Sequence, residues 1–195
     1  MITTGEGGSA HTDNRRYFNL MKSICSHGIV RKNKNLNIRI NHLLYDQRYL
    51  GFNYRLTDIQ ASLGVSQLKK LTYFVNKRRE IAKVYNKYLD KAKLYLPKEK
   101  KYAKSSYHLY VVLIKENKKN LRDRLIRYLK NQGIYTNIHY KPIHLQSYYQ
   151  NLKFKKNDFL NSELYYKSAL SLPIHPNLKK KELMLIIKKI NNFLK

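Results

Sequence analysis

The segment GFNYRLTDIQ, residues 51–60, holds the strongest local structural signal in this chain of 195 residues. Thr57 is followed three residues later by Gln60, which is the capping-box pattern, where each side chain satisfies a free backbone amide at the start of a helix. Apolar residues then recur at helical spacing as far as Leu89. The pattern predicts either one long helix or two helices in tandem, with a break or bend near Thr72.

The sequence after residue 100 predicts a small α/β unit in which helices cover a sheet of few strands. Residues 107–114 contain no Asp, Glu, Lys or Arg, so they predict a central strand covered on both faces, and residues 135–139 predict a second strand. Gly133 is a natural left-handed cap for the helix before it. The remaining predicted elements are helices over residues 14–25, 121–129, 158–170 and 183–194, a short strand over residues 9–12, and a polar surface loop over residues 29–50.

The charge of the chain is strongly positive, with 40 Lys and Arg against 12 Asp and Glu, a formal net charge of +28. The lysines are spread along the whole sequence beside helical apolar residues, which is typical of solvated faces, so we do not expect nucleic acid as a partner. A basic protein that binds nucleic acid or another polyanion remains the alternative from a different class, and its affinity would fall steeply with salt.

The compartment can be predicted from two further features of the sequence. A single cysteine, Cys25, allows no internal disulfide, which favours a reducing environment. No apolar stretch approaches the length of a membrane-spanning helix, and the first residues lack the pattern of a signal peptide. We therefore expect a cytoplasmic protein without a membrane partner.

Three segments have the composition of a ligand site, and the first is the glycine-rich turn at residues 5–8, which either binds phosphate on its backbone amides or is only a tight turn. Asn53 and Arg55 lie just before the predicted helix start, where backbone amides favour an anion; alternatively Asn53 shapes the turn and Arg55 pairs with a carboxylate. His139, Tyr140 and His144 share a short loop that contains a proline and suits a polar small molecule such as a sugar. We expect no metal, because two histidines five residues apart, with no carboxylate close in sequence, make a poor ligand set.

Six segments, read in order, resemble the DegT/DnrJ/EryC1/StrS family of sugar aminotransferases. The resemblance implies an α/β fold, namely the C-terminal part of a pyridoxal-phosphate (PLP) enzyme of fold type I, similar to aspartate aminotransferase, and mainly its small domain. It is strongest toward members that aminate the 4-keto position of a UDP-linked 6-deoxy sugar, as in pseudaminic acid synthesis. The segments that carry it are residues 2–8 (ITTGEGG), 26–28 (SHG), 51–64 (GFNYRLTDIQASLG), 67–68 (QL), 106–110 (SYHLY) and 139–146 (HYKPIHLQ).

The resemblance also implies partners and roles for individual residues. Such enzymes use PLP to transfer an amino group, usually from glutamate, to a nucleotide-linked keto-sugar, a precursor of polysaccharides and other glycans. Asn53 matches the asparagine that reaches the cofactor phosphate of the neighbouring subunit in a dimer, and Arg55 lies in the same turn. His139, Tyr140 and His144 match the loop that lines the sugar side of the cleft.

The resemblance further implies that this chain is truncated. The lysine that binds PLP covalently would lie just upstream of Met1, so no catalytic residue is assigned here, and we expect the chain to be inactive alone. The expected partner is a second copy, as a homodimer, or a complementary N-terminal fragment. The expected domains are a remnant of the PLP-binding large domain (residues 1–30), a loop with the cofactor and dimer turn (31–56), and a long helix with the C-terminal small α/β domain (57–195).

Overall fold

The fold is described from a computed structural model, which describes residues 1–30, 45–116, 120–155 and 157–195. It contains both helices and short strands, which agrees with the predicted α/β class. The chain divides into two compact units, one formed by Ile2–Lys70 and the other by Leu71–Lys195 with Met1. Each unit is described separately below.

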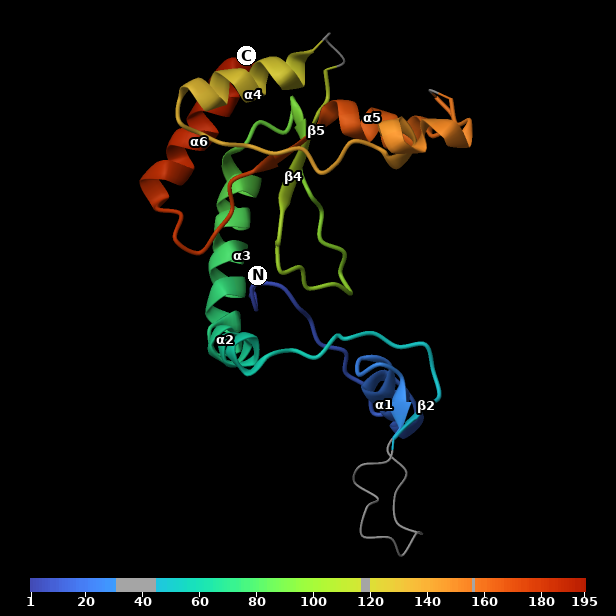
Figure 1. Cartoon of the computed structure of the whole chain (residues 1–195). Coiled ribbons are helices and arrows are strands. Elements are labelled where there is room, and N and C mark those ends of the chain that lie inside the picture. The colour runs from blue at the N-terminus through green and yellow to red at the C-terminus, as the bar shows by residue number, and fades with distance from the viewer. Residues whose placement is uncertain (31–44, 117–119, 156) are drawn as a thin grey trace, which may run out of the picture. The chain divides into compact units, whose positions relative to one another are not determined.

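The unit formed by Ile2–Lys70 begins with an irregular stretch and helix α1 (Arg15–Ile24). The side chain of Asn14 caps α1 by accepting hydrogen bonds from two backbone amides of its first turn. Strand β1 (Ile29–Val30) lies against α1 and pairs antiparallel with β2 (Asp46–Gln47) (Figure 1). The strand predicted over residues 9–12 is wrong, because these residues form no ladder, and most of the loop predicted over residues 29–50 falls on 31–44, outside the described residues.

Helix α2 (Asp58–Lys69) confirms the capping box. Thr57 accepts a hydrogen bond from the Gln60 amide, and the Gln60 side chain accepts one from the Thr57 amide at 3.2 Å. Helix α3 (Leu71–Tyr88) follows directly, so the alternative with two tandem helices is the correct one. None of the α2 residues is buried, and several of its apolar side chains are exposed, among them Ile59 (83%), Val65 (59%) and Leu68 (59%).

The second unit contains a three-stranded antiparallel sheet. Its strand order is β3 (Leu94–Tyr95), β4 (Tyr110–Ile114), β5 (Ala169–Leu172), so the predicted strand within residues 107–114 is indeed the central one. It starts three residues later than predicted because Tyr107 has a left-handed backbone (φ 46°), which no strand residue adopts. In the register, Tyr110 pairs with Leu172 and Leu113 with Ala169.

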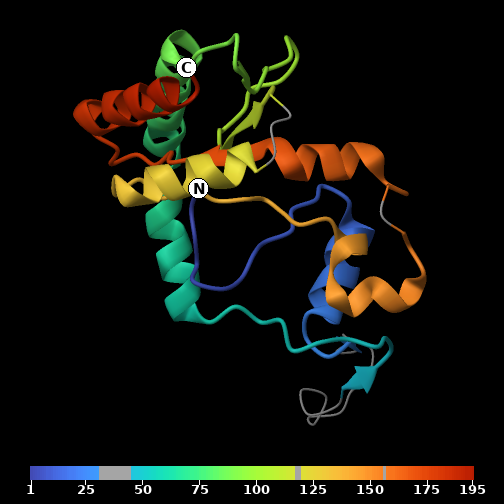
Figure 2. The same ribbon diagram turned by 90° about the horizontal axis from the view of Figure 1, so that it is seen from above.

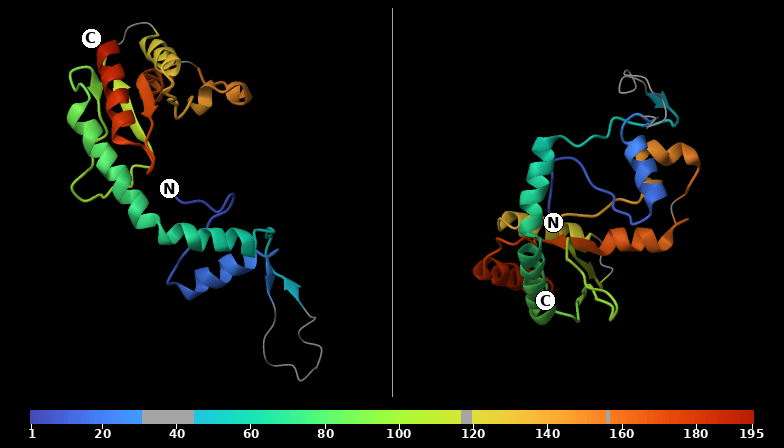
Figure 3. Two further views of the ribbon diagram at one scale, coloured as in Figure 1. Left: turned by 90° about the vertical axis from the view of Figure 1, so that its left-hand side faces the viewer. Right: turned by 90° about the horizontal axis from the view of Figure 1, so that it is seen from below.

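The core of this unit lies between the sheet and three helices. Helix α6 (Lys180–Phe193) packs against both α3 and α4 (Leu121–Asn131) (Figures 2 and 3). Gly133 adopts φ 72° just after α4, as its predicted cap requires. The largest fully buried hydrophobic side chains come from all of these elements: Tyr85, Leu94, Tyr110, Val112, Leu125, Leu129, Leu170 and Ile190. In the described part of the chain, no helix has both the length and the apolar character needed to cross a membrane.

Two predictions in the second half are corrected by the sheet. Residues 135–139 form no strand but a single bridge, in which Asn137 pairs with Ser171. Helix α5 (Leu160–Ser168) ends two residues earlier than predicted, because the chain continues as β5 and all four β5 residues are buried against β4. Two short 3-10 helices, Ile143–Leu145 and Ser147–Leu152, precede α5.

Candidate functional site

The turn that carries Asn53 is held by backbone hydrogen bonds to the end of α1. The His27 amide donates to the Phe52 carbonyl at 2.9 Å, and the Phe52 amide donates to the Ile24 carbonyl at 2.8 Å. Ser26 and Asn53 form an antiparallel bridge. The two segments SHG (26–28) and GFN (51–53) are thus joined in space, although 22 residues separate them in the sequence.

Glycine is required at positions 28 and 51 because the backbones of the two segments lie in direct contact there. A Cβ on Gly51 would lie 2.0 Å from the Gly28 nitrogen, and a Cβ on Gly28 would lie 1.8 Å from the Tyr49 carbonyl oxygen. Gly28 also has φ 69°, in the left-handed region. The close approach fixes the backbone that presents Asn53.

Asn53 and Arg55 contact each other. Arg55 Nε donates to Asn53 Oδ1 at 3.1 Å, and Arg55 Nη2 lies 3.5 Å from His27 Nε2. Among the described residues, no carboxylate pairs with Arg55, and no acceptor forms a hydrogen bond with Asn53 Nδ2. The pair therefore offers free N–H donors of the kind that bind a phosphate or a carboxylate.

The glycine-rich turn at residues 5–8 belongs to the same unit and is tied to the helix start. Gln60 Nε2 donates to the Glu6 carbonyl at 2.8 Å. Gly5 and Gly7 have φ 82° and 139°, and a Cβ on Gly7 would lie 2.9 Å from the Leu56 side chain. The capping box therefore orders this turn as well as starting α2.

A basic hollow of about 1190 Å³ adjoins Arg55. Its lining includes five cationic side chains, and the nearby carboxylate of Asp46 pairs with one of them, Arg48, at 3.0 Å. The sequence analysis did not predict this cluster of cations, because its residues come from segments far apart in the sequence. Only Arg55 belongs to a segment that was predicted to bind a ligand. The cations are Arg15, Arg16, Lys22, Arg48 and Arg55.

In the second unit, His139 lines a cavity of about 330 Å³ together with His108, Tyr135 and Asn137. His139 Nδ1 and Ser171 Oγ form a hydrogen bond at 2.7 Å, which orients the imidazole. Burial lowers the pKa of His108, so this imidazole is neutral at pH 7. Two histidines and the Asn137 amide thus line the same cavity. Of these three residues, only His139 was predicted as a site residue from the sequence.

The other two predicted residues of this loop differ in their environment. Tyr140 is 72% exposed and stacks edge-on against His139 with ring centres 4.6 Å apart. His144 is buried: its Nε2 lies 3.1 Å from Glu163 Oε1, and its ring lies 4.7 Å from that of Phe159. His144 therefore anchors the loop, whereas His139 is half-buried at the cavity and Tyr140 is exposed.

Arg78 of α3 forms hydrogen bonds with the backbone of residues that line the same cavity. Its Nη1 donates to the carbonyls of His108 and Ile174 at 3.1 and 2.8 Å, and to that of Tyr107 at 3.3 Å. Thr136, in the lining, has a buried hydroxyl with no described partner. The described residues hold no group of three or more His, Cys, Asp or Glu side chains that could bind a metal ion.

Comparisons with known proteins agree with one another over almost the whole chain. The chain is 37% identical over 184 residues to a UDP-4-amino-4,6-dideoxy-N-acetyl-beta-L-altrosamine transaminase of Campylobacter jejuni, covering 93% of this chain and 46% of that protein. Its fold matches that of Helicobacter pylori PseC, an aminotransferase involved in the biosynthesis of pseudoaminic acid, with a TM-score of 0.77, 29% identity, and coverage of 94% and 47%.

A third match concerns the fold alone. A Streptococcus pneumoniae protein, solved in a PLP-form, has a TM-score of 0.80 at 24% identity, with 95% of this chain and 45% of that chain covered. The chain spans about half the length of the curated relatives it matches. The model of the DegT/DnrJ/EryC1/StrS aminotransferase family matches residues 1–191. This chain therefore belongs to that family, and the Campylobacter and Helicobacter relatives described above are named as a transaminase and an aminotransferase.

Proposed function

We propose that this chain is the C-terminal portion of a PLP-dependent enzyme that transfers an amino group, from glutamate, to a keto-sugar carried on a nucleotide. The product would be a precursor of a polysaccharide or another glycan. Family membership supports the reaction class, and the name of the Campylobacter relative supports a UDP-linked 4-amino-4,6-dideoxy sugar as the aminated product, formed from the 4-keto-6-deoxy sugar. The observation that carries the proposal is the pair of free donors presented by Asn53 and Arg55 on a rigid turn.

The donors of this turn fit the phosphate of PLP. Asn53 Nδ2 and Arg55 Nη1 have no partner among the described residues, and the Gly28–Gly51 contact fixes the backbone of the turn. PLP, when bound, acts as an electron sink for the amino-transfer chemistry. By the family resemblance, this turn would serve the cofactor of a neighbouring subunit, so we propose that the active assembly is a homodimer or a complex with a complementary N-terminal segment.

The basic hollow beside Arg55 suits the diphosphate of the nucleotide. Several guanidinium groups and an ammonium face one space, and arginine binds phosphate oxygens in a bidentate manner. Its cations belong to the same compact unit as Asn53. We propose that the hollow receives the diphosphate of the sugar nucleotide and that Arg55 contributes to it.

The loop of residues 139–144 would line the sugar side of the cleft. His139 presents an imidazole to its cavity and Tyr140 an exposed phenol, and both groups suit sugar hydroxyls. His144 would act as a positioning residue, because its buried contact with Glu163 holds the loop. These three residues therefore share one loop but have two roles.

The lysine that binds PLP would be supplied by a segment outside these 195 residues, and we propose that the chain alone does not complete the reaction. Residues 1–30 would belong to the PLP-binding large domain, residues 31–56 to the cofactor and dimer turn, and residues 57–195 to the helix pair and the small domain. The exposed apolar side chains of α2, such as Ile59 and Leu68, support an assembly with another chain or segment.

The test is PLP binding, measured by equilibrium dialysis, for the chain alone and for the chain co-expressed with a segment that carries the family's lysine. We expect PLP retention and glutamate-dependent amination of a UDP-linked 4-keto sugar only in the co-expressed sample. Asn53→Ala should weaken PLP retention there, whereas Asn161→Ala, an exposed asparagine on α5, should not. PLP retention that is equal in all samples would contradict the role of Asn53.

A further inference from the structure

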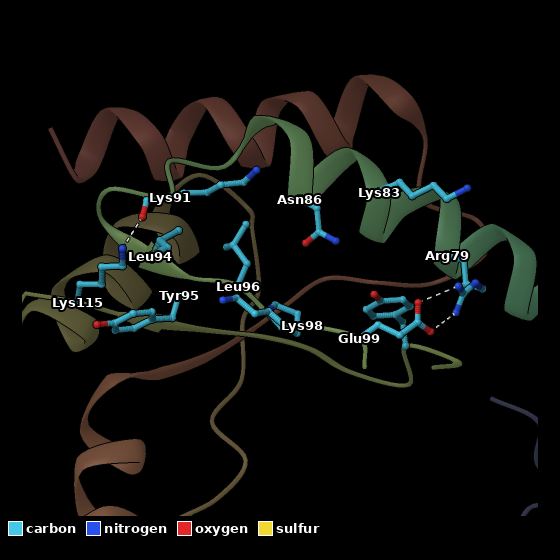
Figure 4. A pocket seen from close by; sticks show the side chains of 12 residues that line it. Arg79, Lys83, Asn86, Lys91, Leu94, Tyr95, Leu96, Lys98, Glu99 and Lys115 are labelled. Carbon is cyan, nitrogen blue, oxygen red and sulfur yellow. Dashed lines mark hydrogen bonds and ion pairs between the residues drawn. The ribbon is translucent and has the colours of Figure 1, made fainter. Parts of the chain in front are cut away.

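A separate pocket of about 730 Å³ opens in the unit formed by Leu71–Lys195, and the proposed function does not use it (Figure 4). One wall is α3, which contributes Arg79, Lys83 and Asn86. The other wall is the segment of residues 91–99, which includes β3. Its volume falls within the range typical of small-molecule sites, about 300–1,000 Å³.

The floor of this pocket is apolar and rigid. Leu94 is 1% exposed and Tyr107 is 9% exposed, and both belong to the hydrophobic core. Leu96 packs against the same core from the pocket side, and Figure 4 shows it in the middle of the pocket. A floor of this kind favours a flat, apolar ring over a fully hydrated ion.

The rim of the pocket carries an excess of positive charge. Four lysines line it, and none of them pairs with a carboxylate among the described residues: Lys83, Lys91, Lys98 and Lys115. The carboxylate of Glu99 is already committed, because both of its oxygens accept from Arg79, at 2.7 and 3.0 Å. The Lys115 ammonium donates to the Lys91 carbonyl at 2.6 Å, but among the described residues no carboxylate neutralises the four charges. The rim therefore favours an anionic ligand.

One polar group is fixed within this apolar lining. Asn86 Oδ1 accepts a hydrogen bond from Tyr110 Oη at 2.6 Å, and Tyr110 is fully buried. The Asn86 Nδ2 donor has no described partner, and Figure 4 shows the amide directed toward the pocket. A ring that carries an acceptor atom would satisfy this donor.

We propose that this pocket binds a ring-bearing phosphomonoester: a planar ring over Leu94 and Leu96, an acceptor on the ring facing Asn86, and the phosphate dianion among the lysines of the rim. The four features on which this rests are the volume, the apolar floor, the positively charged rim and the oriented amide. No residue of the proposed cofactor turn or sugar loop takes part.

The test is calorimetric titration of the full chain with naphthyl phosphate, inorganic phosphate, naphthol and adenosine monophosphate. Both ring-bearing phosphates should bind, and inorganic phosphate and naphthol should each bind at least about tenfold more weakly, since each lacks one half of the recognised structure. Adenosine monophosphate should bind more tightly than naphthyl phosphate, because its ring carries acceptor atoms for the Asn86 amide and the naphthalene ring carries none. Equal binding of inorganic phosphate and naphthyl phosphate would overturn the proposal.

A matched pair of variants separates the pocket from the general charge of the chain. Lys83→Gln with Lys98→Gln removes two charges at the rim, and Lys180→Gln with Lys181→Gln removes two exposed charges on α6. The first pair should raise the Kd for naphthyl phosphate by about tenfold, as expected for lost charge-assisted hydrogen bonds, while the second leaves it nearly unchanged. An equal loss in both would show that only net charge attracts the ligand and would overturn the proposal.

Discussion

Glu163 accepts a hydrogen bond at 3.1 Å from Nε2 of His144, and the two side chains are 3% and 6% exposed. The same carboxylate oxygen, Oε1, accepts from the Asn157 amide at 2.6 Å. These two donors, the backbone amide first and the imidazole second, lower the pKa of Glu163. The contact joins the loop of residues 139–144 to α5.

Removing the imidazole should destabilise the second unit. His144→Ala leaves a buried carboxylate with only a backbone donor, so we expect the free energy of unfolding to fall by about 1–3 kcal/mol in urea denaturation. His175→Ala removes an exposed histidine and should change it by less than about 0.5 kcal/mol. Equal stability of the two variants would contradict an anchoring role for His144.

The Gly51 position should not accept a side chain. Gly51→Ala places a Cβ 2.0 Å from the Gly28 nitrogen, which must push the two backbones apart. We expect faster hydrogen exchange at the amides of His27 and Phe52, whose hydrogen bonds hold the turn. Gly8→Ala is the control, because a Cβ there meets nothing within 4 Å. Unchanged exchange in Gly51→Ala would show that the turn does not depend on this approach.

Local signals of the sequence predicted part of this fold well, because a helix start is encoded within four residues. Thr57 and Gln60 predict the start of α2, and Gly133 predicts the end of α4, without any knowledge of distant residues. Strand β5 was missed for the opposite reason. Its first two residues, Ala169 and Leu170, continue the predicted helix, and only pairing with β4, more than fifty residues away, makes Ala169–Leu172 a strand.

In the candidate sites, too, contacts between residues close in sequence were predicted, whereas contacts between distant segments were not. Asn53 and Arg55 are close in sequence and are in contact in the fold. His27 beside Arg55, Ser171 beside His139, and the arginines of α1 that line the basic hollow come from distant segments. Contacts between distant segments depend on the topology of the chain, which the periodicity of apolar residues alone does not specify.

Acid should remove one contribution to stability that comes from Glu99. The Arg79 hydrogen bonds, and then that of the Ser105 amide, lower the Glu99 pKa to about 2. An unfolded glutamate has a pKa of about 4.3, so the stabilisation is complete above that pH and is lost as the pH falls toward 2. The difference in Tm between the wild type and Glu99→Gln should therefore hold at neutral pH and shrink across this range.

The control for this pH dependence is Glu80→Gln. Glu80 pairs with Lys77, but its side chain is 61% exposed, whereas that of Glu99 is 24% exposed. The Tm difference for Glu80→Gln should be smaller at neutral pH, because exposed ion pairs contribute little. A Tm difference for Glu99→Gln that persists unchanged at pH 2.5 would mean that the Glu99 charge is not its source.

Gln60 has two separable roles that a pair of variants can distinguish. Its Oε1 accepts from the Thr57 amide in the capping box, while its Nε2 donates to the Glu6 carbonyl. Gln60→Glu keeps the acceptor, and its charge is favourable at a helix N-terminus, but it cannot donate to Glu6. Gln60→Ala loses both contacts, while Thr57 Oγ1 keeps the hydrogen bond from the backbone amide of residue 60.

We therefore expect hydrogen exchange to separate the two variants. The turn at residues 5–8 should be more readily cleaved by protease in both, because both lose the tie to the Glu6 carbonyl. The first turn of α2 should exchange faster only in Gln60→Ala, since Gln60→Glu retains the capping box. Ser62→Ala, which removes an exposed hydroxyl bonded to the Ile59 carbonyl within α2, controls for a change in the helix itself. If the turn at residues 5–8 resists protease equally in Gln60→Glu and the wild type, its order comes from the glycine backbone and not from Gln60.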